Sequence, residues 1–158
     1  VSTQQSECLV RDAHSKAVTC IALAEGSSYV SHPPAYYDLF LTSSCDNVVK
    51  LWDMRTMGTH SGSVACFGGC SSGFAASCGP RVHSRHPQVG VSLSPCLRYA
   101  ACGSENNCWF LYDLRWTGAP LQTCRVGCDI VSTVAFNPKH PQVATAGFDG
   151  HVRFFSDK

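Results

Sequence analysis

Short segments in which apolar and polar residues alternate recur along the chain, and residues typical of turns separate them. Segments of this length and pattern predict β-strands. They fall into three groups: AVTCIAL, DLFLTSS and NVVKLWD; GVSLS, RYAACGS and CWFLYD; and IVSTVAF, QVATAG and HVRFF. The sequence therefore predicts an all-β fold made of three similar units.

The second and third segments of each group are joined by residues that favour a tight hairpin turn. These are Asp46-Asn47, Asn106-Asn107 and Asp149-Gly150. Asn, Asp and Gly tolerate the positive φ angles that such turns require. Turns at matching positions predict that each unit contains an antiparallel hairpin.

A longer motif closes each unit. Residues 41–53, LTSSCDNVVKLWD, align with AACGSENNCWFLYD at 100–113 and ATAGFDGHVRFFSD at 144–157. The motif resembles a WD repeat, the blade unit of one class of β-propeller. Phe155 follows Tyr112 by 43 residues, a usual WD period, whereas Tyr112 follows Trp52 by 60. The longer interval predicts an insertion at residues 68–88, whose Gly, Ser and Pro content is typical of a loop.

The resemblance implies one domain over residues 1–158, a partial or open propeller of about three WD-type blades. The expected ranges are 6–11 for the outer strand of a preceding blade, 14–67 for the first blade, 89–125 for the second and 126–156 for the third. Three blades do not close a ring, because propellers have typically 4 to 8 blades. We therefore expect either a fragment of a longer propeller, which the missing initiator Met also favours, or half of a six-bladed ring made by two copies.

In the WD family a hydrogen-bonded tetrad of His, Ser, Asp and Trp pins each blade. The resemblance assigns these roles to His14, Ser44, Asp46 and Trp52 in the first blade. The carboxylate accepts from the imidazole, and the hydroxyl links the imidazole to the indole N–H, so the buried polar groups are satisfied. Ser, His and Asp also occur together in hydrolases, but their fit to the WD pattern favours the structural role.

The other two blades depart from the tetrad. The second keeps Ser104 but has Asn106 and Tyr112 where Asp and Trp are expected, and the third keeps Asp149 but has Phe155 in place of Trp. We expect both blades to be held mainly by apolar packing and to open more readily than the first.

The Gly-His pair that should precede each blade is also changed. Gly69-Cys70 and Gly127-Cys128 occupy the matching positions. Either His83 or His86 is an alternative source of the imidazole for the second blade, and the spacing does not choose between them.

Charge and hydropathy argue against a nucleic-acid-binding, membrane-spanning or secreted protein. The chain has 12 basic and 11 acidic residues, a net charge of +1, which gives no electrostatic reason to expect nucleic acid or an anionic membrane as partner. No apolar run approaches the roughly 20 residues that span a bilayer, and VSTQQSE lacks the hydrophobic segment of a secretory signal. We expect a soluble protein of the cytosol or nucleus.

The eleven cysteines are an odd number and include no C-x-x-C, so we expect mostly reduced thiols. Cys20 and Cys102 lie in apolar segments and are expected to pack as small hydrophobes. One set of residues in and beside the insertion is a candidate zinc site: Cys66, Cys70, Cys78, His83 and His86. Closed zinc sites have tighter paired spacing, so no metal or cofactor is predicted.

WD propellers usually serve as platforms for other proteins, and the resemblance implies a non-catalytic scaffold. No set of residues suggests a catalytic site by the usual criteria. Nucleic-acid binding would depend on Arg81, His83, Arg85 and His86, a basic cluster without interleaved aromatic residues, and is disfavoured.

The rim that carries the hairpin turns is the expected docking face. It would present Ser15, Lys16, Cys45, Asn47, Glu105, Asn107, Asp129 and Phe148. Phe148 is the strongest candidate anchor, because an aromatic residue in an exposed turn supplies apolar contact area. The alternative is that Phe148 folds back onto the insertion.

A second candidate contact lies after the third strand of the first blade. Trp52-Asp53-Met54-Arg55 is a W-D-x-R sequence that resembles the box by which some WD proteins dock onto the adaptor of cullin-RING ubiquitin ligases. Tyr112-Asp113-Leu114-Arg115 is a weaker version. Arg55 and Arg115 would offer a guanidinium to a partner, whereas the structural alternative is that Arg55 pairs with Asp53.

Overall fold

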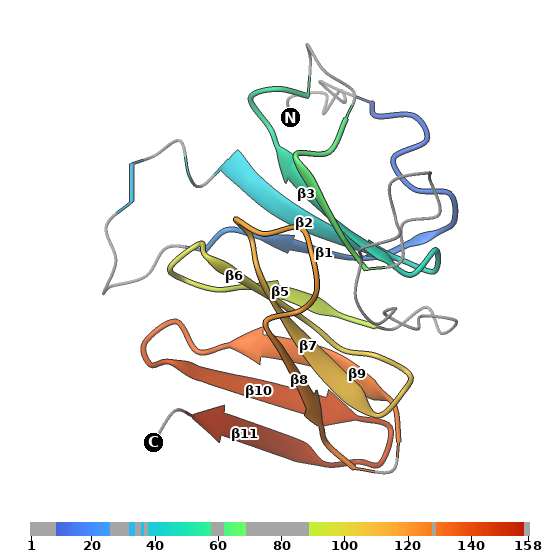
Figure 1. The fold of residues 1–158 in the computed structure, drawn as a ribbon, viewed down its shortest axis with the longest axis vertical. Helices are drawn as coiled ribbons and strands as arrows, with labels where there is room; N and C mark the ends of the chain where they lie inside the picture. The colour runs from blue at the N-terminus through green and yellow to red at the C-terminus, as the bar shows by residue number, and fades with distance from the viewer. Residues whose placement is uncertain are drawn as a thin grey trace, which may run out of the picture.

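The computed structural model describes residues 9–25, 32–33, 36, 38–57, 62–68, 89–127 and 129–156. In this part of the chain, the strands form three antiparallel sheets that follow one another along the long axis of the molecule (Figure 1). None of the described segments forms a helix long and apolar enough to cross a membrane. The predicted all-β fold with three units is confirmed.

Each sheet corresponds to one blade, and its strands follow in sequence order. The first blade contains β1 (Val18–Leu23), β2 (Leu39–Ser44), β3 (Val48–Asp53) and β4 (Ala65–Gly68). The second contains β5 (Val91–Leu93), β6 (Tyr99–Cys102), β7 (Cys108–Asp113) and β8 (Gln122–Arg125). The third contains β9 (Val131–Phe136), β10 (Gln142–Gly147) and β11 (Val152–Ser156).

One expected range falls half outside the described residues, and another falls almost entirely outside them. Of the expected outer strand at 6–11, residues 6–8 lie outside them, and residues 9–11 are not in a strand. Of the expected insertion at 68–88, Gly68 is the last residue of β4 and residues 69–88 lie outside them.

The hairpin turns form where the sequence predicts them. Asn47, Asn107 and Gly150 have φ angles of 68°, 63° and 75°. These are left-handed conformations, which Asn and Gly adopt at lower cost than other residues. In the first turn the N–H of Asn47 donates to the carbonyl of Ser44 at 3.1 Å. The prediction of three matching hairpins is confirmed.

The innermost strands join the blades, because β5 packs against both β1 and β9. Between the first two blades, the hydroxyl of Ser43 donates to the carbonyl of Val89 at 3.0 Å. Between the second and third, the N–H of Gly90 donates to the carbonyl of Ser132 at 2.7 Å. These bonds satisfy backbone polar groups between neighbouring sheets.

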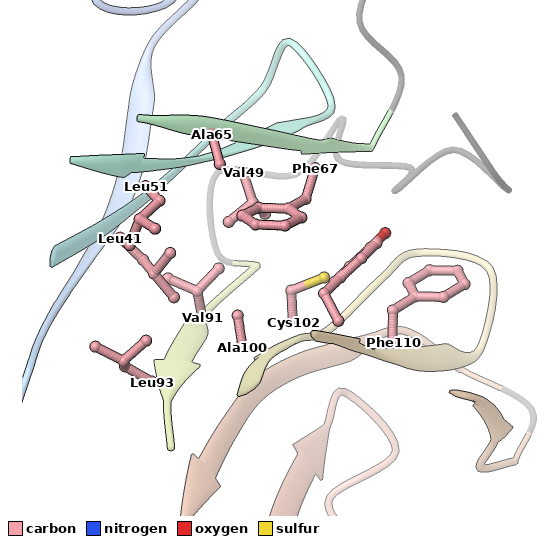
Figure 2. Close-up of a cluster of buried hydrophobic side chains, with 11 residues drawn as sticks. Leu41, Val49, Leu51, Ala65, Phe67, Val91, Leu93, Ala100, Cys102 and Phe110 are labelled. Carbon is pink, nitrogen blue, oxygen red and sulfur yellow. The ribbon is translucent and has the colours of Figure 1, made fainter. Parts of the chain in front are cut away.

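Apolar side chains fill the space between neighbouring blades. Figure 2 shows Leu41, Val49 and Phe67 of the first blade facing Val91 and Cys102 of the second. Burial raises the pKa of the Cys102 thiol to about 12, so this cysteine is protonated and packs as a small hydrophobe, as predicted.

The second blade contributes to two cores. Along β7, Phe110 and Tyr112 belong to the core shared with the first blade. Trp109 belongs to the core shared with the third blade, and Leu111 packs against that core. Successive residues of a strand point to opposite faces, so the alternation along CWFLYD places the middle sheet between two apolar layers.

Candidate interaction surfaces

A continuous chain of side-chain hydrogen bonds pins the hairpin of the first blade. The imidazole of His14, in the loop before β1, contacts Asp46 (Nδ1 to Oδ2, 3.0 Å) and Thr42 (Nε2 to Oγ1, 2.7 Å). The indole N–H of Trp52 donates to the same hydroxyl of Thr42 at 2.8 Å. The His14 side chain is fully buried, so a substrate cannot reach it. These hydrogen bonds therefore have a structural role.

Burial lowers the pKa of His14 below its ordinary value of 6.5, although Asp46 opposes the shift. Neutral His14 donates from Nδ1 to the carboxylate and accepts from the Thr42 hydroxyl at Nε2. Burial tends to raise the pKa of Asp46, but hydrogen bonds from His14, Ser15 and Val48 keep it below its ordinary value. A neutral imidazole beside an ionised carboxylate is therefore the resting state.

The hydroxyl that links the imidazole of His14 to the indole of Trp52 is that of Thr42. The prediction that Ser44 supplies this hydroxyl was wrong. Ser44 instead serves the turn: its hydroxyl donates to the carbonyl of Lys16 at 3.2 Å and accepts from the N–H of Asp46 at 3.1 Å. Thr42 and Ser44 lie on the same face of β2. Strand register decides between them, because Phe40 pairs with Trp52, which makes Thr42 the diagonal neighbour of the indole.

The second blade has a different arrangement at the matching positions. Ser104 is fully buried and accepts a long hydrogen bond from the N–H of Asn106 at 3.5 Å, while Asn106 is itself exposed. Tyr112 is buried against Phe67 of the first blade, with 5.4 Å between ring centroids. Aromatic packing therefore occupies the place of the tetrad in this blade.

In the third blade a nearby arginine takes the place of the imidazole. The guanidinium of Arg153 donates to Oδ2 of Asp149 at 2.6 Å, and the N–H of His151 donates to Oδ1 at 3.0 Å. The Arg153 hydrogen bond is the main reason that the pKa of Asp149 falls to about 2. Phe155 packs on Trp109 of the second blade at 5.3 Å between ring centroids.

The residues expected on the hairpin rim differ in exposure. Lys16 and Asp129 are exposed, whereas Cys45, Asn47, Glu105 and Asn107 are half-buried. Ser15 is exposed but donates to Asp46 from its N–H at 3.0 Å, so it also supports the tetrad. Phe148 is 46% exposed, and the alternative that it packs on the insertion involves residues outside the described ranges.

The model of the family described as WD domain, G-beta repeat (WD40) matches residues 6–53 and 118–156, more than half of the chain. The chain belongs to the WD40 repeat family. WD40 repeats generally indicate a protein-interaction scaffold, and proteins of this family are generally non-catalytic. The match leaves out residues 54–117, which contain most of the second blade, where Asn106 and Tyr112 replace the family's Asp and Trp.

In the W-D-x-R sequence of this WD40 chain, Arg55 binds the aspartate of the same motif, Asp53. Arg55 donates to Asp53 through its backbone N–H and Nε, both at 2.9 Å, and through a second guanidinium nitrogen. The guanidinium holds the pKa of Asp53 below its ordinary value. Asp53 is buried, whereas the side chain of Arg55 is 54% exposed, so a partner would reach Arg55 rather than Asp53.

The same fork recurs one blade later. Arg115 donates to Asp113 from its backbone N–H, from Nε at 3.1 Å and from a second guanidinium nitrogen at 2.8 Å. Hydrogen bonding to Arg115 keeps the pKa of Asp113 well below its ordinary value. The repetition indicates that an Asp-x-Arg turn is a local structural unit of these blades.

The candidate zinc ligands cannot be assembled from the described residues. Cys66 is half-buried, with its Sγ 3.2 Å from the hydroxyl of Ser63. The other four, Cys70, Cys78, His83 and His86, lie outside the described ranges, as do Arg81 and Arg85 of the basic cluster. Among the residues described, His, Cys, Asp and Glu form no group of three or more that could hold a metal ion.

Proposed function

We propose that this chain is a non-catalytic protein-interaction scaffold whose partial propeller is completed by further blades, in the simplest case by a second copy. The observation that carries the proposal is the apolar character of the two outer faces. Val152 and Phe154 on β11 are 62% and 76% exposed. On β1 of the opposite blade, Ile21 and Leu23 are exposed as well.

These side chains lie on the faces that would meet neighbouring blades. Cys20 and Ala22 pack into the core between the first two blades, so Ile21 and Leu23 alternate to the other side of β1. Phe155 packs toward the second blade, so Phe154 points away from it. Two copies of three blades make six, within the usual range for closed propellers, and closure would remove both faces from water.

The test is the solution mass of the purified chain, measured by light scattering together with circular dichroism. The chain mass is 17.0 kDa, and the expected result is a folded species of twice that mass. Ile21→Asp should give a folded monomer, because a charge on the joining face opposes association. Trp116→Asp is the matched control, since Trp116 is exposed but lies in the β7–β8 connection, outside the sheets. A folded parent at the monomer mass would overturn closure by a second copy.

Docking onto the adaptor of a cullin-RING ubiquitin ligase is the second candidate function. It is favoured by the exposed guanidinium of Arg55 at the end of β3, although a partner carboxylate must compete with Asp53 for it. In a pull-down with purified adaptor, Arg55→Ala should reduce capture more than Arg115→Ala, the matched change in the second blade. No capture by the parent, or equal capture by Arg55→Ala, would remove this function.

A further inference from the structure

A groove of about 1020 Å³ lies between the second and third blades. Trp109, Leu111 and Leu121 line it from the second blade, and Val143 and Phe155 line it from the third. The connections β5–β6 and β9–β10 also line it. These connections lie at the strand ends away from the hairpin turns, so the groove opens on the opposite side from the predicted docking rim.

Among the described residues that line the groove, the one formally charged side chain is a cation, Lys139. Lys139 is exposed in the β9–β10 connection, and His140 follows it. No Asp or Glu occurs among the described lining residues, and none of the ion pairs found among the described residues involves Lys139. The groove thus combines apolar walls with a cationic end, which complements an apolar ligand that carries a carboxylate.

One wall contains a polar atom that the described residues leave without a partner. Trp109 is 3% exposed, and its indole nitrogen is buried with no hydrogen-bond partner among the described residues. Buried donors are nearly always satisfied in folded proteins. A ligand carbonyl that enters beside the ring, as the neighbouring side chains shift, would supply the acceptor.

We propose that this groove binds an extended acidic peptide segment of a partner protein. Apolar side chains of the segment lie against Leu121 and Phe155, a carboxylate lies beside Lys139, and a backbone carbonyl accepts from Trp109. The groove volume is at the top of the range of roughly 300 to 1,000 Å³ that is typical of small-molecule sites. A peptide fills such a space and offers a carbonyl acceptor at every residue.

The groove lies away from the hairpin rim, but Phe154 of one outer face also lines it. Peptide binding is therefore measured on the parent and on the Ile21→Asp monomer, in which the ring does not close. The probe is a random library of linear peptides, selected on the purified chain. The selected sequences are then synthesised with a fluorophore and titrated by anisotropy. We expect them to combine apolar residues with Asp or Glu, and we expect binding to shift the indole N–H resonance that Trp109→Phe removes.

Two variants test the groove at exposed positions, where substitution should leave the fold intact by circular dichroism. Leu121 is 61% exposed, and Leu121→Glu should weaken binding by about tenfold or more, through lost apolar burial. Lys139→Glu should weaken it by about threefold or more, through the lost ion pair and the new repulsion. Phe148→Ser on the hairpin rim and Ile21→Asp on the outer face are the controls and should bind like the parent.

Selected peptides that lack acidic residues, or that bind Leu121→Glu and Lys139→Glu as tightly as the parent, would overturn the proposal. Loss of binding in Phe148→Ser would place the peptide on the hairpin rim and would also overturn it. If Leu121→Glu halves the solution mass, the groove is an interface between copies, and the peptide site is rejected. If Ile21→Asp does not change the solution mass, that result contradicts ring closure by a second copy and leaves the peptide site unaffected.

Discussion

The hydroxyl of Thr42 lies between two buried nitrogens, 2.8 Å from Nε1 of Trp52 and 2.7 Å from Nε2 of His14. It accepts from the indole and donates to the neutral imidazole, so one small side chain satisfies two larger ones. Loss of this hydroxyl would leave both nitrogens without partners in a buried site, and such groups cost more than the net value of one hydrogen bond.

Thr42→Val keeps the shape of the side chain and removes only the hydrogen-bonding group. We expect the free energy of unfolding to fall by about 2 to 4 kcal/mol, because two buried groups become unsatisfied. Urea denaturation at neutral pH measures the change. Ser44→Ala is the matched control. Its two partners are backbone groups of exposed Lys16 and half-buried Asp46, where water can replace the hydroxyl, so it should cost only about 1 kcal/mol. An equal or larger loss in Ser44→Ala would contradict the assignment of Thr42.

The lowered pKa of His14 predicts a loss of stability in mild acid. Its folded-state pKa lies below 6.5 because of burial, so the unfolded chain takes up a proton first as pH falls through about 6.5. Stability should therefore be greatest above that pH and decline below it, until the folded protein also binds the proton. Urea midpoints at pH 7.5 and at pH 5.5 measure the decline.

His14→Gln serves as the control for the other histidines of the chain. The variant should be less stable than the parent at pH 7.5, but the difference between the two proteins should shrink at pH 5.5. A constant difference across this range would show that His14 does not cause the decline.

The outline of the fold could be predicted because it depends on local patterns. Alternation of apolar residues and the turn preferences of Asn47, Asn107 and Gly150 act over a few residues, so they can be read directly from the sequence. The same alternation in β7 places Trp109 and Tyr112 on opposite faces. The motif at residues 41–53 then predicts the order of the strands, because it resembles a WD repeat.

The side-chain hydrogen-bond partners were harder to predict, because they depend on the register of paired strands and on the length of each side chain. Thr42 and Ser44 are two residues apart on one face, and only the pairing of Phe40 with Trp52 shows which hydroxyl meets the indole. A sequence signal existed, since Thr145 stands at the same offset before Phe155 as Thr42 does before Trp52. The groove beside Trp109 left no such signal, because it is formed by connections from two different blades.

The ion pair of Asp149 with Arg153 predicts that the pKa of Asp149 will rise when Arg153 is replaced. Asp149 has a pKa of about 2, mainly because Arg153 donates a hydrogen bond to its carboxylate. This depressed pKa contributes stability above pH 3.8, which is lost as pH falls toward 2. Arg153→Met should raise the pKa of Asp149 toward 3.8, as measured by ¹³C NMR of the side-chain carboxyl. An unchanged pKa would show that the backbone N–H of His151 alone sets it.

Gly103 permits the close approach of the second and third blades. A Cβ atom at this position would lie 2.2 Å from the carbonyl oxygen of Val131, far inside van der Waals contact with backbone that cannot move aside easily. The adjacent N–H of Val131 donates to the carbonyl of Ser104 at 3.0 Å, so relief of the clash would strain a hydrogen bond between the blades. Gly103→Ala should therefore lower the free energy of unfolding by about 1 to 3 kcal/mol.

Gly62→Ala is the matched control, because nothing lies within 4 Å of a Cβ atom built there. That variant should unfold within about 0.5 kcal/mol of the parent, as is usual for surface substitutions. Urea denaturation compares the two variants, and hydrogen exchange then locates the effect. Amides of β9 should exchange faster in Gly103→Ala, whereas those of β2 and β3 should keep their protection, because the contact with Val131 lies between the second and third blades. Equal stability of Gly103→Ala and Gly62→Ala would show that the blades are not in contact at this point.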